Sequence, residues 1–269
     1  MNDRVRPDGT VPGAFIVEFG PTQQSWVDPE RPDYLVFEYV QHIAMLLDCS
    51  VLRAPADRRL RVVHLGGGGL TLPRWVEWRR PATAQVVCEP DADLTAEVRR
   101  KLPLGRRSGI KVRDVDARSG VAAMPANWAE VVILDAFDGD QVPAELVTSE
   151  FFEEVRRLQR EESLLIVNLT DTAPFPWAKR VAAGLARHWP RLLAGAEPAV
   201  FKGRRFGNLV LAAGAGRIDL VALRREAAKL PHGYRWLDGR EFDGWVGGEE
   251  PWTDADARPS PPPPRSWLR

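Results

Sequence analysis

Cysteine and histidine are scarce in this chain of 269 residues, which has two cysteines and four histidines. The histidines do not have the spacing of metal ligands, so no metal site is expected. A disulfide between Cys49 and Cys88 is possible. Each cysteine lies beside an apolar run, however, and two buried free thiols are the expected state.

Net charge and long apolar runs are also absent. Lysine and arginine together number 37, as do aspartate and glutamate, so the formal net charge is zero. A neutral chain has no overall field to capture nucleic acid or an anionic membrane, and neither is expected as a partner. No apolar run reaches the ~18 residues that a membrane helix needs, and the first residues lack the apolar core of a signal peptide. The sequence therefore predicts a soluble, cytoplasmic protein.

Glycine, in contrast, is concentrated at one point. Four consecutive glycines, Gly66 to Gly69, separate a short apolar run at 61–65, typical of a buried strand, from a helical pattern at 70–79. Without Cβ atoms the backbone can take positive φ angles and let another molecule approach closely. The free N–H groups of a helix N-terminus favour oxygen-rich groups. This turn predicts a site for a nucleotide-like ligand.

From residue 60 onward, short apolar runs alternate with amphipathic helical patterns. The alternation predicts a three-layer α/β domain of the Rossmann-like kind, with a parallel sheet covered by helices on both faces. Beyond the first strand and helix, strands are expected at 85–88, 110–113, 130–134, 163–169 and 206–213, and helices at 92–102, 148–158 and 176–188.

Four segments are expected along the chain. Residues 1–58 would contain a loose arm at 1–12, a β-hairpin at 15–27 and a helix at 33–47, with Asp33 as a possible N-cap. Residues 59–216 would form the nucleoside-binding domain, and residues 217–250 a C-terminal helix and loop. Residues 251–269 are acidic and then rich in proline, which predicts a disordered or polyproline II tail; a ligand for a proline-recognition domain is the other interpretation.

Acidic residues follow three of the predicted strands at their carboxyl ends, where open parallel sheets bind their ligands. Glu89 follows the glycines by about 20 residues, where a carboxylate can accept both hydroxyls of a ribose. Asp116, followed by Ala117, is placed to meet an adenine amine, and Asp135 ends the next strand. Any one of these acids could instead cap the following helix. The order of strand, glycine turn, helix, strand and acid favours a nucleoside site.

The sequence of the glycine turn bears on which nucleoside would bind. NAD is a candidate, but the turn does not carry glycine at the first, third and sixth places of the G-x-G-x-x-G motif. One acid after each of three successive strands also suits an adenosyl ligand without a pyrophosphate.

At this point the chain resembles a known family, the spermidine synthases and their spermidine synthase-like relatives. The most specific part is Leu134-Asp135-Ala136-Phe137-Asp138, followed by Val142-Pro143 and Thr148-Ser149-Glu150-Phe151; residues 65–74, Glu89 and residues 114–118 add to it. The resemblance covers roughly residues 13–213. It implies the class I methyltransferase fold and a role in polyamine biosynthesis.

The resemblance implies a role for each matched residue. The co-substrate would be an S-adenosyl nucleoside, either decarboxylated S-adenosylmethionine or S-adenosylmethionine itself, bound by Gly66, Gly67, Gly68, Gly69, Glu89, Asp116 and Ala117. Asp135 takes the place of the family's catalytic aspartate and Asp138 that of its substrate-binding partner. Gln24 (or Gln23) and Glu38 fall near substrate-binding positions of the family.

The chain departs from the family in the part that would bind the polyamine. Gly69 and then Leu70 stand where the family's glycine motif continues with an aspartate. The family's Tyr-His-Glu triplet becomes Val36-Phe37-Glu38. Lys202 lies where synthases carry a Tyr-Pro element, and a lysine there would repel a dication unless it points to water.

Three functions are compatible with these residues. The leading hypothesis is a transferase that moves an aminopropyl group to a small-molecule amine, which intact Asp135 and Asp138 favour. The second is an S-adenosylmethionine-dependent methyltransferase, favoured by the loss of the glycine-turn aspartate. The third is a non-catalytic protein that binds a nucleoside or a partner. A homodimer is expected, and some of the ten tryptophans could form its interface.

Overall fold

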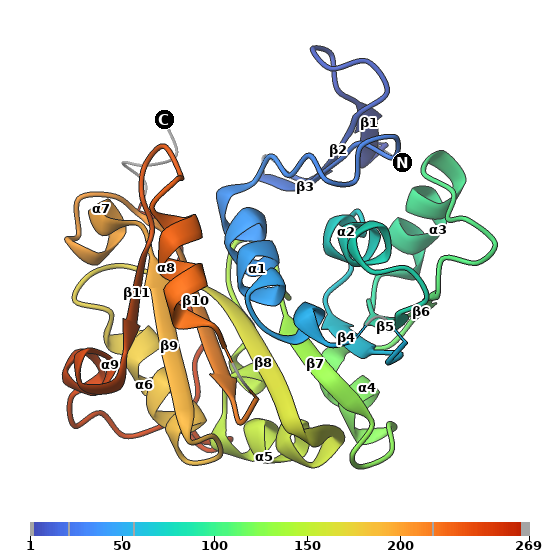
Figure 1. Cartoon of the computed structure of the whole chain (residues 1–269). Helices are drawn as coiled ribbons and strands as arrows, with labels where there is room; N and C mark the ends of the chain where they lie inside the picture. Colours follow the sequence, from blue (N-terminus) through green and yellow to red (C-terminus); the bar gives the residue numbers. More distant parts are fainter. Residues whose placement is uncertain (1–2, 21, 56, 217, 265–269) are drawn as a thin grey trace.

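The computed structural model describes residues 3–20, 22–55, 57–216 and 218–264. Its centre is an eight-stranded sheet with the order β11-β9-β10-β8-β7-β4-β5-β6 (Figure 1). The strands that run parallel to one another are β4 (Arg61–Leu65), β5 (Ala84–Cys88), β6 (Ile110–Arg113), β7 (Ala129–Leu134) and β8 (Gln159–Asp171). The carboxyl ends of these strands therefore meet at one edge, as the sequence predicted.

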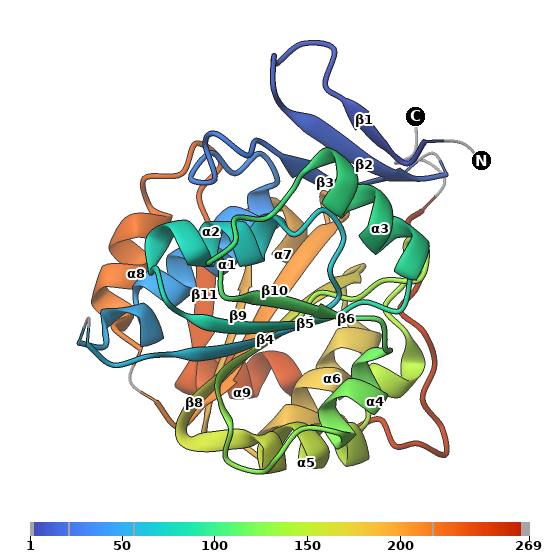
Figure 2. The ribbon, with the colours of Figure 1, turned by 90° about the vertical axis from the view of Figure 1, so that its right-hand side faces the viewer.

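Helices cover both faces of the sheet (Figure 2). One face carries α1 (Glu38–Asp48), α2 (Thr71–Arg79), α3 (Ala92–Lys101) and α8 (Leu220–Ala227), and the other carries α4 (Ala117–Ala122), α5 (Ser149–Leu158), α6 (Pro176–Ala186) and α9 (Gly239–Val246). Successive residues of a strand point to opposite faces. Val62 accordingly packs with the first group of helices, and its neighbour Val63 packs with the second. The three-layer α/β fold is confirmed.

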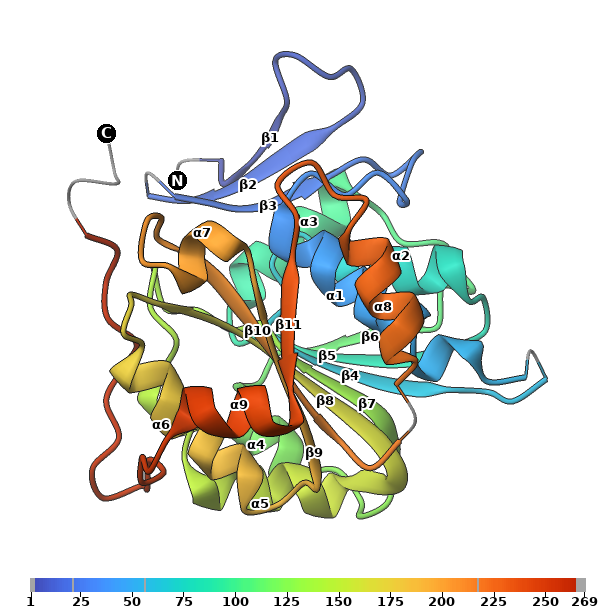
Figure 3. The same ribbon diagram turned by 60° about the vertical axis from the view of Figure 1, so that its left-hand side comes forward.

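The expectation of a wholly parallel sheet is wrong beyond β8. Figure 3 brings β9 (Arg191–Ala196), β10 (Gly207–Gly214) and β11 (Arg235–Asp238) to the front. β10 lies between β8 and β9 and runs antiparallel to both, and β11 runs antiparallel to β9. The chain reverses between β9 and β10 through only a short segment containing α7 (Pro198–Phe201), which leaves no room for the crossover that parallel neighbours need.

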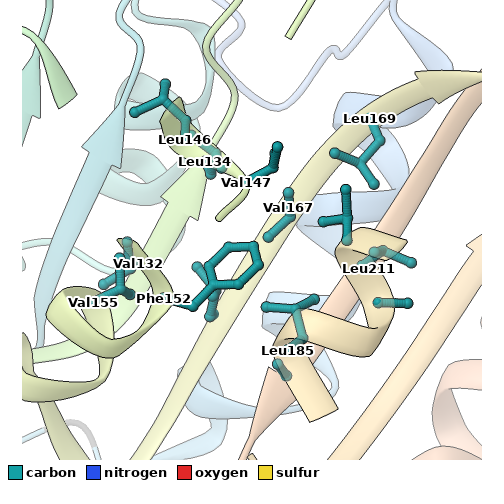
Figure 4. Packing of buried hydrophobic residues seen from close by; sticks show 14 of the residues in the cluster. Val132, Leu134, Leu146, Val147, Phe152, Val155, Val167, Leu169, Leu185 and Leu211 are labelled. Carbon is teal, nitrogen blue, oxygen red and sulfur yellow. The ribbon is translucent and has the colours of Figure 1, made fainter. Parts of the chain in front are cut away.

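Phe152 lies at the centre of the larger core (Figure 4), between the sheet and two helices. It packs with Val132 and Val167 of the sheet, Val155 of α5 and Leu185 of α6. Phe152 is fully buried, and burying such a side chain stabilises the fold by roughly 1.5–3 kcal/mol. The apolar runs of β7 and β8 thus fix the sheet that carries the site at its edge.

The N-terminal segment contains the predicted hairpin, formed by β2 (Phe15–Phe19) and β3 (Thr22–Val27). The loose arm expected before it is wrong in part, because β1 (Val5–Pro7) pairs with β2. Val5 is fully buried, and its N–H donates to Glu97 Oε1 of α3 at 3.0 Å. Such a contact across the chain leaves no local signal in the sequence.

The helix expected from residue 33 begins later, at Glu38, and its N-cap is Phe37 with extended backbone angles, not Asp33. Gln41 holds the preceding segment outside the helix by donating from Nε2 to the Leu35 carbonyl at 2.6 Å. Cys49 and Cys88 are both free and buried, as predicted. In the part of the chain that the structure describes, no helix combines the length and apolar character needed to span a membrane.

The expectation of a disordered tail is wrong for residues 251–260, which pack along α6 and α5. The indole Nε1 of Trp252 donates to the Trp177 carbonyl at 3.2 Å, and the Arg180 guanidinium lies 3.5 Å from the centre of the Trp252 ring. The Trp177 Nε1 in turn donates to the Arg258 carbonyl at 2.8 Å. Proline excludes regular hydrogen bonding within the tail but leaves its carbonyls free for these contacts. Residues 265–269 lie outside the described residues.

Candidate functional site

A cavity of about 360 Å³ lies at the carboxyl ends of the parallel strands, between the sheet edge and the N-terminal hairpin. Most of the site residues predicted from the sequence line it, namely Gln24, Gly66, Gly67, Gly68, Glu89, Asp116, Ala117, Asp135 and Asp138. Gly69 and Glu38 are not among the lining residues. The fold thus brings together side chains that are spread over more than a hundred positions of the sequence.

The glycine turn is enclosed by the backbone at Asp135 and by side chains of the hairpin. Gly66 has a φ of +102°, and a Cβ atom there would lie 2.1 Å from the backbone oxygen of Asp135. Gly68 has a φ of +47°, and its Cβ would lie 2.6 Å from Ser25 Oγ. Only glycine fits both positions. The Gly69 N–H donates to Ser25 Oγ at 2.9 Å, so it faces the hairpin and not the cavity.

Glu89 closes the other side of the turn. Its Oε2 accepts from the N–H groups of Gly67 at 2.9 Å and Gly68 at 3.3 Å, and its Oε1 accepts from the Asp91 N–H at 3.0 Å. The N–H groups expected to be free for a ligand are therefore held by a carboxylate of the protein. These bonds use three of the four lone pairs of the Glu89 carboxylate, so Oε1 keeps one lone pair that can accept a hydroxyl group.

Asp116 caps a helix and also lines the cavity. Its Oδ1 accepts from the Ser119 N–H at 2.8 Å and so caps α4. Hydrogen bonds from the Ser119 side chain and then its N–H hold the pKa of Asp116 below its usual value. The residue also lines the cavity next to Ala117. It is thus a fixed, ionised acceptor at the cavity wall.

Asp135 follows β7 and faces the cavity while protein surrounds its other sides. Burial raises the pKa of its carboxyl above the usual value, and hydrogen bonds from Asn168 and Tyr39 act in the opposite direction. Asn168 Nδ2 donates to Asp135 Oδ1 at 2.8 Å, and Asn208 Nδ2 donates to Asn168 Oδ1 at 3.0 Å. Two neighbouring strands, β8 and β10, therefore orient the Asp135 carboxylate.

Sequence reasoning missed part of this network. Asn168 was not among the site residues expected from the sequence; it is buried, does not line the cavity and binds Asp135. Tyr39 and Asn208 were not among the expected site residues either. The sequence contained only a weak signal for this network. Asn168 lies within an apolar strand, and a buried side-chain amide needs a hydrogen-bond partner.

Asp138 begins a tight turn at the cavity mouth. Its N–H donates to the Gln141 carbonyl at 2.8 Å, and the Gln141 N–H donates back to the Asp138 carbonyl at 3.1 Å. Gln24 Nε2 of the hairpin donates to the Gly139 carbonyl at 2.7 Å. Of the two glutamines considered, Gln24 lines the cavity while Gln23 is exposed.

Glu38 is held outside the cavity by an ion pair. Arg205 Nη2 lies 3.2 Å from Glu38 Oε2, and Arg205 Nη1 lies 2.8 Å from Glu197 Oε2. A cation of the protein thus bridges the two carboxylates. Lys202 is exposed and does not line the cavity, so it does not place its charge there.

The charge of the cavity lining is strongly one-sided. Among the residues that the structure describes, no lysine or arginine lines the cavity, whereas seven carboxylates do: Glu18, Glu89, Asp91, Asp116, Asp135, Asp138 and Glu145. Arg6 pairs with Glu18, and Arg4 pairs with Asp91. Among the described residues the other five form no ion pair, so the cavity has a negative potential that attracts a cation.

The seven carboxylates are not gathered into one compact group. In the described ranges, no three or more His, Cys, Asp or Glu side chains form a group that could hold a metal ion. The carboxylates are distributed around the cavity, an arrangement that suits an extended organic cation with several polar groups.

Comparisons with known proteins agree with the fold. No protein-family model matches the chain. A polyamine aminopropyltransferase from Vibrio vulnificus is 26% identical over 137 residues, which cover 50% of this chain and 45% of that protein. A probable spermidine synthase from Corynebacterium glutamicum has a crystal structure that matches with a TM-score of 0.85 at 26% identity, covering 93% of this chain and 92% of that one. Human methyltransferase-like protein 13, solved in complex with SAH, matches with a TM-score of 0.57 at 18% identity, covering 81% of this chain and 96% of that one.

These findings confirm the class I methyltransferase fold and the resemblance stated from the sequence. The similarity in sequence has a limit, since the chain spans about half the length of the curated relatives it matches.

Proposed function

Because the chain is spermidine synthase-like in sequence and in fold, we propose that it transfers an aminopropyl group from decarboxylated S-adenosylmethionine to a small-molecule amine. The nucleoside would lie in the cavity, with its ribose against Glu89 and its adenine against Asp116 and Ala117. Asp135 would act as the base, and Asp138 would hold the acceptor.

One observation carries this proposal: within the described part of the chain, the cavity is lined by seven carboxylates and by no lysine or arginine. Decarboxylated S-adenosylmethionine carries a sulfonium and an ammonium and has no carboxylate. S-adenosylmethionine carries a carboxylate as well, which would meet only like charges here. The N–H groups of Gly67 and Gly68, which could have received that carboxylate, are held by Glu89. The cavity therefore favours the decarboxylated co-substrate.

The chemistry needs a base beside the acceptor, because an ammonium has no free lone pair. Once its proton passes to the Asp135 carboxylate, the amine nitrogen forms a bond to the carbon next to the sulfonium. The carbon–sulfur bond breaks, and its electron pair returns to sulfur to give a neutral thioether. A positioned base of this kind typically contributes about 10²–10⁴-fold in rate. The raised pKa of Asp135 makes it a better proton acceptor than an ordinary aspartate.

Ligand binding provides the first test. A ligand that binds only the folded protein raises the free energy of unfolding by about 2.7 kcal/mol when its concentration is 100 times its Kd. This corresponds to a rise in Tm of about 5 °C or more. We expect decarboxylated S-adenosylmethionine to give a larger shift than S-adenosylmethionine at the same concentration. A larger shift with S-adenosylmethionine would favour the methyltransferase hypothesis, which the leucine at position 70 supports. No shift with either ligand or with methylthioadenosine would contradict a nucleoside site.

Turnover provides the second test. Asp135→Asn should reduce aminopropyl transfer by about 10²–10⁴-fold while nucleoside binding is kept. The variant preserves the size of the side chain, and binding of methylthioadenosine by calorimetry serves as its control. Unchanged turnover would remove Asp135 from the role of base.

A further inference from the structure

Ser260 in the C-terminal tail is fully buried, although it lies among prolines and far along the sequence from every predicted site residue. Its Oγ accepts from the Val142 N–H at 2.9 Å, and its N–H donates to the Val142 carbonyl at 3.1 Å. The Gln141 side-chain amide donates to the Ser260 carbonyl. Every backbone polar group of Ser260 is therefore bound to residues 141–142.

Residues 141–142 are continuous with the turn that begins at Asp138. Asp138 and Gln141 exchange two backbone hydrogen bonds, and Gln24 donates to Gly139 from the hairpin on the other side. The turn is thus held between one segment near the N-terminus and one near the C-terminus. In Figure 2 the tail, in red, rises past α6 and α4 toward the part of the molecule that carries β1, β2 and β3.

The rest of the tail anchors Ser260 in this position. Trp252 is buried against α6, and Arg180 forms an ion pair with Asp256 at 2.5 Å. Arg118 of α4 pairs with Asp254 at 2.7 Å. Ser260 also lies near the end of β8, since its Oγ is 3.5 Å from Thr170 Oγ1. The turn is therefore coupled to the helices that support the sheet.

We propose that Ser260 is a positioning residue for the Asp138 turn, and that the tail from Trp252 to Ser260 sets the geometry of the acceptor side of the cavity. The proposal rests on the function proposed above, in which Asp138 holds the amine. Ser260 does not line the cavity, so it would act only through Gln141 and Val142.

Ser260→Ala tests this directly, because it removes the acceptor of a buried N–H and keeps Cβ. Loss of that acceptor should loosen the turn, and we expect the KM for the amine to rise about tenfold with kcat and the affinity for methylthioadenosine changed less than twofold. Ser260→Pro removes the N–H donor as well and extends the proline run, so its effect should be larger. Ser50→Ala is the matched control, since Ser50 is also buried and its hydroxyl bonds to Leu46 at the end of α1.

Hydrogen exchange separates this proposal from the proposed function. In Ser260→Ala the amides of Asp138, Gln141 and Val142 should exchange about tenfold faster, while those of β7 keep their wild-type rates. Faster exchange at Val142 alone with an unchanged KM would overturn the positioning role, as would equal acceleration throughout the chain. If the protein transfers no aminopropyl group, the proposed function fails, and the exchange rates at Asp138 and Gln141 still decide whether Ser260 positions the turn.

Discussion

Asp135 is subject to two opposing influences, and the balance between them decides how basic it is. Burial favours the protonated carboxyl, whereas hydrogen bonds from Asn168 and Tyr39 favour the carboxylate. The Asn168 amide is itself fixed by Asn208, so its donor points at Asp135 and its acceptor is satisfied. These hydrogen bonds favour the carboxylate and so oppose the effect of burial, which still leaves the pKa of Asp135 above its usual value.

Removing the Asn168 amide should therefore move the pH dependence of the reaction. Asn168→Ala deletes a hydrogen bond that lowers the pKa of Asp135, so that pKa should rise further. Because the base must be deprotonated, activity should then be lost at a higher pH as the solution is acidified. The acidic limb of kcat/KM against pH gives the measurement. Asn208→Ala should move the limb in the same direction by less, and an unmoved limb in Asn168→Ala would contradict the role given to this network.

At the scale of elements, the turn between β4 and α2 is fixed by close backbone contacts. Gly66 lies against the carbonyl of Asp135, so the glycine turn and the candidate base depend on the same contact between β4 and β7. Leu70 enters α2 in a left-handed conformation and is buried against the hairpin. An apolar residue at this position thus serves packing.

Gly66→Ala should be severely destabilising. A Cβ atom 2.1 Å from the Asp135 oxygen forces the two strands apart, and a positive φ adds strain, for a total cost of roughly 3 kcal/mol or more. Gly233→Ala is the control: Gly233 also has a positive φ, but no atom would contact its Cβ, and the cost should be only about 1–2 kcal/mol. Urea unfolding measures both. If both variants lose the same free energy of unfolding, the strain of a positive φ accounts for the whole cost, and the contact with Asp135 adds nothing.

At the scale of the whole molecule, both ends of the described chain add to the central domain. β1 attaches to α3 through Val5, and the tail attaches to α6 through Trp252. The turn at Asp138 is held by Gln24 of β3, in the N-terminal hairpin, and by Ser260 of the tail. The cavity is therefore a product of three parts of the chain that are remote in sequence.

The packing of the tail can be measured through its tryptophan. Trp252→Ala should lower the free energy of unfolding by about 3 kcal/mol, because it removes a buried indole and its stacking with Arg180. Val221→Ala, at a side chain that is 79% exposed, should change it by no more than about 0.5 kcal/mol. A Trp252 variant as stable as the wild type would mean that the tail contributes no stability in solution.

The sequence by itself determined the elements whose signals are local. The apolar runs of β4, β5, β7 and β8, the glycine turn and the acids at strand ends were all readable, because side-chain periodicity and the need for glycine depend on neighbours along the chain. From these followed the fold and the grouping of Glu89, Asp116 and Asp135 around one cavity.

Only the tertiary structure decided how those residues are held. Asn168 and Tyr39 reach Asp135 across the sheet, Arg205 neutralises Glu38, and Ser260 binds the turn after Asp138. The antiparallel insertion of β10 between β8 and β9 and the packing of the tail were likewise decided by the tertiary structure. Each of these features depends on contacts between segments that are far apart in the sequence. Such contacts contribute free energy only after the fold has brought the segments together, so no local sequence pattern predicts them.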